Sequence, residues 1–227
     1  MAQLRALSAL PAFLLLLAAC GGSNEPGPDP GPGRIIFSRA GNQRFDIYAM
    51  DLNGQNLQQL TTSFAIEDWA AWSPDTMKIA FMANLIPDST YAPRNQIWVM
   101  NADGSSLSQL TFPNPAKDSI TGLVIDTTGN FHPAWSPDGT KIAFASTRDS
   151  SSEIFVMDPN GANVTRLTSN PAQDAQPAWS PDGSKIAFVT DRDGNGEIYV
   201  MNLDGTGQVN ITNNPAGDSR PAWRPRP

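Results

Sequence analysis

The sequence PAWSPDGSKIAF at residues 177–188 is repeated almost unchanged as PAWSPDGTKIAF at residues 133–144, and a weaker copy, AAWSPDTMKIAF, occupies residues 70–81. The tryptophans of the two strong copies are 44 residues apart, and Trp223 follows after another 44. Internal repeats of about 40 to 45 residues that each contain four short strands are typical of β-propeller blades. The repeat therefore predicts an all-β fold of the propeller class.

A single repeat has the pattern of a four-stranded antiparallel sheet. It contains two runs that are rich in β-branched and aromatic residues and bounded by turn-forming residues, as strands are. These runs are KIAFV at residues 185–189 and EIYVM at residues 197–201. The sequence SPDG at residues 180–183 supplies a proline and a glycine for a tight turn. We expect the order tryptophan strand, KIAF strand, EIYVM strand and short outer strand, with the repeat tryptophans packed between blades.

The interval between the second and third repeats is longer than the period. Trp72 and Trp135 are 63 residues apart, which is 19 more than in the other repeats. Six of the extra residues fall within residues 84–95 and thirteen within residues 116–132. Both insertions lie between expected strands, so we expect them to form loops.

The first repeat lacks its tryptophan strand. Proline occupies every second position of residues 26–33, PGPDPGPG, and proline does not pair inside a sheet. Residues 221–227 carry a tryptophan strand with no further strand after it. We expect this C-terminal strand to complete the first blade and to close a monomeric ring of four four-stranded antiparallel blades, which would remove exposed sheet edges. An open arc that dimerises into a larger ring is the alternative.

The repeat resembles those of a known family. PAWSPDG-x-KIAF is followed by TDRDGNGEIYVMN at residues 190–202 and by the pattern L-T-x-N-P, as at residues 167–171. Together these motifs resemble the WD-like repeats of the TolB β-propeller family over residues 34–227. The resemblance implies a rigid propeller, with four blades where TolB has six and with no counterpart of the TolB N-terminal α/β domain. It does not specify an activity, because similar repeats also occur in propellers attached to peptidases.

The N-terminus has the features of a lipoprotein signal. A positively charged start is followed by an apolar run at residues 6–19, which is too short to cross a bilayer as a helix. The sequence LAAC at residues 17–20 matches the bacterial lipobox, so we expect a diacylglyceryl group on the thiol of Cys20. Cys20 is the only cysteine, so no disulfide can form within one molecule.

These signals divide the chain into three parts. Residues 1–19 are the expected lipoprotein signal peptide, residues 20–33 the lipidated cysteine with a Pro/Gly tether, and residues 34–227 the propeller. The lipid anchor predicts attachment to the membrane of the bacterial cell envelope. In a cell with two membranes, Gly21 after the cysteine resembles a signal for the outer membrane, on either the periplasmic or the surface face.

Charge and motifs exclude several classes of function. The net charge is −7 and lysine and arginine do not cluster, which argues against nucleic acid as a partner. The sequence contains no G-x-S-x-G motif, so no serine hydrolase is indicated. His132 is the only histidine, and we expect it to be a surface or hydrogen-bonding residue at the channel mouth rather than a general base.

Acidic residues recur before the innermost strand of each blade. The pattern N-P-A-x-D ends at Asp118, Asp174 and Asp218, and Glu67 takes the same place in the first repeat. These carboxylates are candidates for a binding site at the mouth of the central channel, where they would need a cation or a basic partner between them. The other possibility is that each one satisfies backbone groups in its own turn.

A calcium loop is a weaker possibility. Asp191, Asp193 and Asn195 fit the opening of such a loop, but Asn202 stands where the loop needs glutamate. No cofactor is therefore expected, apart from this possible Ca²⁺ site.

The sequence favours one function and leaves one alternative. We expect a non-catalytic, lipid-anchored scaffold that holds an envelope protein through its loop-bearing mouth. The alternative is a glycan-binding or hydrolytic module that uses an acidic central channel.

Overall fold

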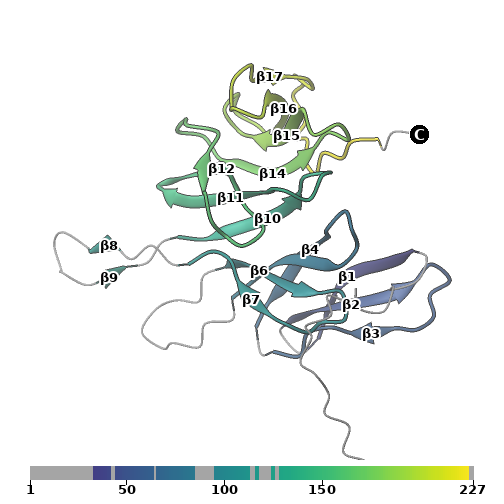
Figure 1. Ribbon diagram of the computed structural model, residues 1–227. Coiled ribbons are helices and arrows are strands. Elements are labelled where there is room, and N and C mark those ends of the chain that lie inside the picture. Colours follow the sequence, from purple (N-terminus) through teal and green to yellow (C-terminus); the bar gives the residue numbers. More distant parts are fainter. Residues whose placement is uncertain are drawn as a thin grey trace, which may run out of the picture.

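The computed structural model describes residues 33–41, 44–63, 65–84, 95–112, 116–117, 124–125 and 128–224 (Figure 1). These residues form strands and turns without any helix, so none of their elements is a helix that could span a membrane. The predicted signal peptide, Cys20, the tether up to residue 32, and Asp118 lie outside the described residues. Most of the two inserted loops lies outside them as well.

The described chain forms four main antiparallel sheets in sequence order. The first contains β1 (Arg34–Ala40), β2 (Phe45–Asp51) and β3 (Gln58–Gln59). The second contains β4 (Glu67–Trp72), β5 (Lys78–Ala83), β6 (Gln96–Asn101) and β7 (Ser108–Gln109). The third contains β10 (Asn130–Trp135), β11 (Ile142–Asp149), β12 (Ser151–Met157) and β13 (Thr165–Arg166). The fourth contains β14 (Asp174–Trp179), β15 (Lys185–Thr190), β16 (Glu197–Asn202) and β17 (Val209–Asn210). A small hairpin of β8 (Ala116–Lys117) and β9 (Val124–Ile125) lies in the second insertion.

This arrangement confirms the predicted fold class and strand order. In each four-stranded sheet the tryptophan strand pairs with the KIAF strand, and the outer two strands follow in sequence. The first sheet has three strands among the described residues, as the missing tryptophan strand predicted. We call β4, β10 and β14 the inner strands, because β10 contacts both β4 and β14 along the inner edge of the arc.

The predicted tight turn forms between each inner strand and the strand that follows. Asp182 accepts hydrogen bonds from the Ser180 hydroxyl at 2.6 Å and from the Ser184 backbone N–H at 3.0 Å. Gly183 has a φ of 70°, which only glycine adopts without strain. In the second sheet Thr76 takes that place with a φ of 61°, so a β-branched residue is held in a conformation that it disfavours.

The hydrophobic core lies between consecutive sheets rather than inside one of them. Ile186, Phe188 and Met201 of the fourth sheet are fully buried against Ala143 and Ile154 of the third. The same positions make the other two interfaces: Ile142, Phe144 and Met157 pack on the second sheet, and Ile79, Phe81 and Met100 pack on the first. Each sheet therefore depends on the next one for its burial.

The repeat tryptophans lie at these interfaces, as predicted. Trp72, Trp135 and Trp179 are partly buried against the three core clusters. The indole N–H of Trp179 donates to the carbonyl of Ala134 in the preceding sheet, with an N–O distance of 3.0 Å. Each of these tryptophans thus belongs to the packing between two sheets.

Closure of the ring by the C-terminal segment is not confirmed. No strand of the first sheet contacts a strand of the fourth, and the two sheets lie at opposite ends of the row in Figure 1. Residues 221–224 form no strand with β1. Instead the indole N–H of Trp223 donates to Ala178 at 3.0 Å, just as Trp179 donates to Ala134. The tail therefore packs on the sheet before it, as every inner strand does.

Candidate functional site

The inner strands share a bulge that turns one side chain of each out of the pleat. The pairing of β4 with β5 shifts between Asp68 and Ala71, and the same shift occurs in β10 and β14. The residue in the bulge has a positive φ in all three strands: Trp69 at 56°, His132 at 54° and Gln176 at 54°. Arg220, at the same repeat position in the tail, has a φ of 57°. Bulges and positive φ values in non-glycine residues are strained features that concentrate at functional sites.

These four side chains, which we call the axial cluster, come together on the inner edge of the arc. The rings of Trp69 and His132 meet edge to face with centroids 4.2 Å apart. The guanidinium of Arg220 lies 5.5 Å from the Trp69 ring, and the Arg220 backbone N–H donates to Gln176 Oε1 at 2.6 Å. The tail thus reaches across to the second sheet and joins residues from three inner strands.

His132 is packed as a neutral ring against Trp69. Burial lowers its pKa to about 4; nearby Arg220 also lowers it, and Asp68 only partly opposes the shift. Its Nδ1 atom has no hydrogen-bond partner among the described residues. The structure therefore places this predicted channel-mouth residue within the axial cluster, half-buried against Trp69.

Two of the predicted acidic residues, Asp174 and Asp218, are held by hydrogen bonds within their own repeats. Asp174 is fully buried and accepts hydrogen bonds from Arg192, at 3.2 Å to both carboxylate oxygens, and from Asn170 at 2.7 Å. Asp218 accepts the equivalent bond from Asn214 at 2.7 Å. Both carboxylates are thus bound by side chains of their own repeat, and the binding site at the channel mouth stays a prediction.

Glu67 is a buried acid whose carboxylate is bound by a hydroxyl group. It is 1% exposed and accepts a hydrogen bond from the Ser63 hydroxyl at 2.6 Å. Its Oε2 atom has no partner among the described residues. Burial is the main reason that its pKa is raised, and nearby Asp46 adds to the effect.

A recurring hydrogen-bond arrangement, which we call the threonine clamp, was not predicted. In each sheet a threonine hydroxyl accepts a hydrogen bond from a backbone N–H near the start of the third strand. Thr168 accepts a hydrogen bond from the backbone N–H of Ile154 at 2.9 Å and donates to the buried Glu153 at 2.6 Å. Burial alone would raise the pKa of Glu153, but the bonds from Thr168 and Asn170 and the charge of Arg166 lower it. The threonine of the L-T-x-N-P pattern was the sequence signal for this clamp, whose role is to tie the outer strand to the sheet.

The residues of the possible calcium loop have separate partners. Asp191 accepts from the Gln173 backbone N–H at 2.7 Å, whereas Asp193 accepts from the Tyr199 hydroxyl at 2.5 Å. The side-chain amide of Asn195 donates to Glu197 at 3.0 Å. Within the described ranges, no group of three or more His, Cys, Asp or Glu residues is placed to hold a metal ion.

Antiparallel sheets arranged in a row around an inner edge, with their cores between neighbours, define a β-propeller. A family model described as the TolB beta propeller domain matches residues 118–227, which confirms the resemblance to TolB-like propellers. The chain is 26% identical to a solved TolB structure from Agrobacterium tumefaciens, with a TM-score of 0.62 over 76% of this chain and 57% of the other. TolB from Acinetobacter baumannii has the same fold at 23% identity, with a TM-score of 0.67 over 84% of this chain and 44% of the other.

A curated relative from Agrobacterium fabrum, an uncharacterised protein, is 30% identical over 128 residues. That match covers 53% of this chain and 37% of the relative. The chain therefore spans between 37% and 57% of the lengths of these three similar proteins.

Proposed function

We propose that this protein is a lipid-anchored propeller of the cell envelope that acts as a non-catalytic scaffold for a protein partner. A TolB-like propeller fold supports a protein-interaction scaffold at the coarse level. The observation that carries the finer proposal is the axial cluster, because its bulged strands present unlike side chains at equivalent positions of one rigid frame. The buried Asp174 accepts hydrogen bonds from Asn170 and Arg192, and these bonds support a structural role for it in the proposal.

The axial cluster has the composition of a protein-binding hot spot. Arginine and tryptophan are the residues that most often dominate binding energy in protein interfaces. Arg220 is exposed and Trp69 is half-buried beside it. A partner segment that enters the inner edge of the arc would meet an aromatic face, a guanidinium and an amide within one small area.

Recovery of partners from crosslinked envelope membranes tests this proposal. The tagged full chain is expected to recover one envelope protein in stoichiometric amount, and Arg220→Ala and Trp69→Ala are each expected to reduce recovery about tenfold. Leu107→Ala, which alters an exposed leucine of a turn in the second sheet, is the matched control and should recover as much as the parent. Melting curves of all variants verify that they remain folded.

Equal recovery with Arg220→Ala and the parent would contradict the role of the axial cluster. Binding on a glycan array without any stoichiometric protein would favour the alternative function, a glycan-binding module. These two results concern the ligand, and neither depends on the anchor.

The anchor is supported by the lipobox that ends at Cys20. A lipid-modified Cys20 would hold the propeller at the membrane through the tether of residues 20–33, and the outer membrane is the proposed site in a cell with two. Mass spectrometry of the N-terminal peptide should find the diacylglyceryl group on Cys20. An unmodified thiol in the membrane fraction would contradict the anchor.

A further inference from the structure

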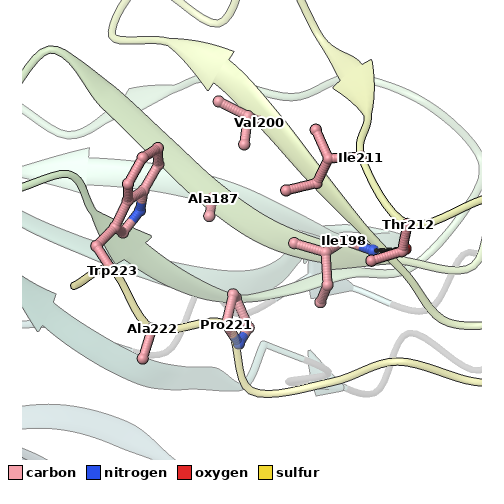
Figure 2. A pocket seen from close by; sticks show the side chains of 8 residues that line it. All are labelled: Ala187, Ile198, Val200, Ile211, Thr212, Pro221, Ala222 and Trp223. Carbon is pink, nitrogen blue, oxygen red and sulfur yellow. Dashed lines mark hydrogen bonds between the residues drawn. The ribbon is translucent and has the colours of Figure 1, made fainter.

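Two polar side chains meet at each junction, by which we mean the contact between one sheet and the next inner strand. The first side chain directly precedes the residue whose backbone N–H enters the threonine clamp. Figure 2 shows that hydrogen bond in the fourth sheet, from Ile198 to Thr212 at 3.0 Å. The second side chain begins the next inner strand, or takes the equivalent place in the tail. The four pairs are Asp46 with Glu67, Gln96 with Asn130, Glu153 with Asp174, and Glu197 with Asp218.

The second junction is held by a pair of neutral amides. The Asn130 side chain donates to Gln96 Oε1 at 2.8 Å, and the Thr111 hydroxyl donates to the same oxygen at 2.8 Å. Gln96 and Asn130 are both fully buried. A direct hydrogen bond between the two side chains therefore satisfies this junction without any charge.

At the third and fourth junctions both side chains are acids, and an asparagine binds the two of them. Asn170 donates its backbone N–H to Glu153 Oε1 at 3.0 Å and its side-chain amide to Asp174 Oδ2 at 2.7 Å. Asn214 makes the same two bonds one repeat later, at 3.0 Å and 2.7 Å. Arg166 also pairs with Glu153, at 2.8 Å. N–H donors thus lie between the two acids at these junctions.

The first junction has neither arrangement among the described residues. Phe45 and Ile66 form a parallel bridge, which places the next residues of the two strands side by side. These residues are Asp46 and Glu67. Ser63 stands where the later repeats have the bridging asparagine, and its hydroxyl donates to Glu67 Oε1 at 2.6 Å. Two acids therefore lie next to each other at this junction without an asparagine at that position.

Each of these two acids keeps one buried oxygen that has no partner in the described part of the chain. The two oxygens are Asp46 Oδ1 and Glu67 Oε2, and the residues are 3% and 1% exposed. A pair of buried acceptors without a donor is unfavourable. One proton between the two oxygens satisfies both, because a protonated carboxyl group donates and the other one accepts.

The groups around Glu67 favour this residue as the carrier of the proton. Burial raises its pKa most, and the Ser63 and Thr61 hydroxyls lower it. The charge of Asp46 raises the pKa of Glu67 and that of Arg44 lowers it, and the sum of these effects is a rise. Asp46 Oδ2 pairs with Arg44 Nε at 3.4 Å, which suits Asp46 to the role of acceptor.

Other charged groups of β4 and of the strands packed against it contact separate partners, as far as the structure describes them. They are Asp68, which accepts from the Ser38 hydroxyl at 2.6 Å; Arg39, which stands opposite Asp46 in the strand pairing but lies over the Tyr48 ring at 4.5 Å; Arg34 and Asp51, which pair with each other at 3.9 Å; Lys78, at the far end of β5; and His132, against Trp69. None of these contacts supplies a donor to Asp46 Oδ1 or Glu67 Oε2.

We propose that Asp46 and Glu67 share one proton, and that this proton closes a pH-sensitive hydrogen bond between the first and second sheets. Glu67 Oε2 carries the proton and donates the hydrogen bond to Asp46 Oδ1. When the proton is lost to solvent at higher pH, two negative charges remain side by side in a buried site and repel each other. The first junction is therefore strongest when protonated, whereas the amide pair of the second junction has no proton to lose.

Carbon-13 NMR of the side-chain carboxyl groups tests where the proton lies. The full chain contains four glutamates, so a sample labelled in glutamate gives few signals, and Glu67→Gln assigns that of Glu67. We expect the Glu67 signal to titrate above pH 4.5, the value of an ordinary glutamate. Glu153 and Glu197 are internal controls, because hydrogen bonds lower the pKa of each, in Glu153 against the effect of burial. A Glu67 signal that titrates together with these two would overturn the proposal.

Exchange of the acid for its amide tests the effect on stability. Glutamine has the shape of the protonated acid, and its amide can donate to Asp46 as Asn130 donates to Gln96. Folded Glu67 holds its proton to a higher pH than the unfolded chain does, so its contribution is full below about pH 4.5 and is lost as the pH rises through the raised pKa. In urea unfolding, Glu67→Gln should therefore raise the ratio of folded to unfolded chain about fivefold at about pH 8 and leave it unchanged at about pH 4.

Asp174→Asn is the matched control, because Asp174 takes the same place at the third junction and is bound by Asn170 and Arg192. The same exchange should here lower the folded-to-unfolded ratio about tenfold at about pH 8, since it leaves Arg192 without its counter-ion. A decrease in Glu67→Gln as well, or no change, would show that Glu67 does not carry a shared proton. The NMR titration of the parent decides the question even if a variant does not fold.

Discussion

At the scale of single residues, two residues are held in energetically unfavourable states: His132 in a buried site and Thr76 with a positive φ. His132 is neutral because burial lowers its pKa to about 4, well below the ordinary value of about 6.5. The unfolded chain therefore takes up a proton first as the pH falls, so the stability of the fold is full above about pH 6.5 and decreases between about pH 6.5 and 4.

This linkage gives a prediction for His132. Between pH 7.5 and pH 5 the parent protein should lose about 1 to 2 kcal/mol of unfolding free energy through this group. His132→Gln should lose less over the same interval, and glutamine fits because Gln176 has the same φ of 54°. Urea unfolding at several pH values measures the difference. Parallel curves for both proteins would show that His132 is not buried as a neutral ring.

Thr76 is the second costly residue. Its φ of 61° lies where β-branched residues are strained, and the equivalent turns have Gly139 and Gly183 with a φ of 70° each. Thr76→Gly should raise the unfolding free energy by about 0.5 to 1 kcal/mol. The reverse change, Gly183→Thr, is the matched control and should lower it. Thermal melting of both variants decides the question, and a lower melting temperature for Thr76→Gly would refute the account of strain.

At the scale of elements, the clamp between the third and fourth strands sets the stability of each sheet. Thr168→Val removes the hydroxyl that binds both the Ile154 backbone N–H and Glu153. Two buried groups then lose a partner, which should cost about 2 to 3 kcal/mol. Thr165→Val, an exposed change in the same sheet, should cost less than about 0.5 kcal/mol. Equal unfolding free energies for the two variants would contradict the role of the clamp.

The elements themselves were largely predictable from the sequence. A fixed period, alternating apolar residues and the SPDG turns sufficed for the strand order, because each repeat carries the same local signals. The axial cluster was only partly predictable. His132 stood out as the sole histidine, but Trp69, Gln176 and Arg220 share nothing except their place three residues before the repeat tryptophan.

The acids illustrate the limit of sequence reasoning in physical terms. Position alone placed Asp174 and Asp218 near the inner edge, but the direction of a carboxylate depends on its hydrogen-bond donors. Asn170 comes from the loop before β14 and Arg192 from the turn after β15, and nothing in the spacing indicated that they would bind Asp174. The same is true of Asn214 and Asp218.

At the scale of the whole molecule, the chain behaves as a row of sheets that each need a neighbour. The expectation that its C-terminal strand closes the ring arose from a correct observation, the surplus tryptophan strand. The sequence could not supply the angle between sheets, because that angle depends on side-chain packing at three interfaces. The tail follows the fourth sheet, where Trp223 bonds to Ala178, and its Arg220 reaches Trp69 of the second sheet.

The melting temperature of Trp223→Ala tests this central claim most directly. If the tail is an inner strand seated on the fourth sheet, removal of the half-buried indole and its bond to Ala178 should cost about 2 kcal/mol and lower the melting temperature by several degrees. Arg224→Ala, the exposed neighbour, should melt like the parent. A Trp223→Ala protein that also melts like the parent would show that the tail is not part of the fold.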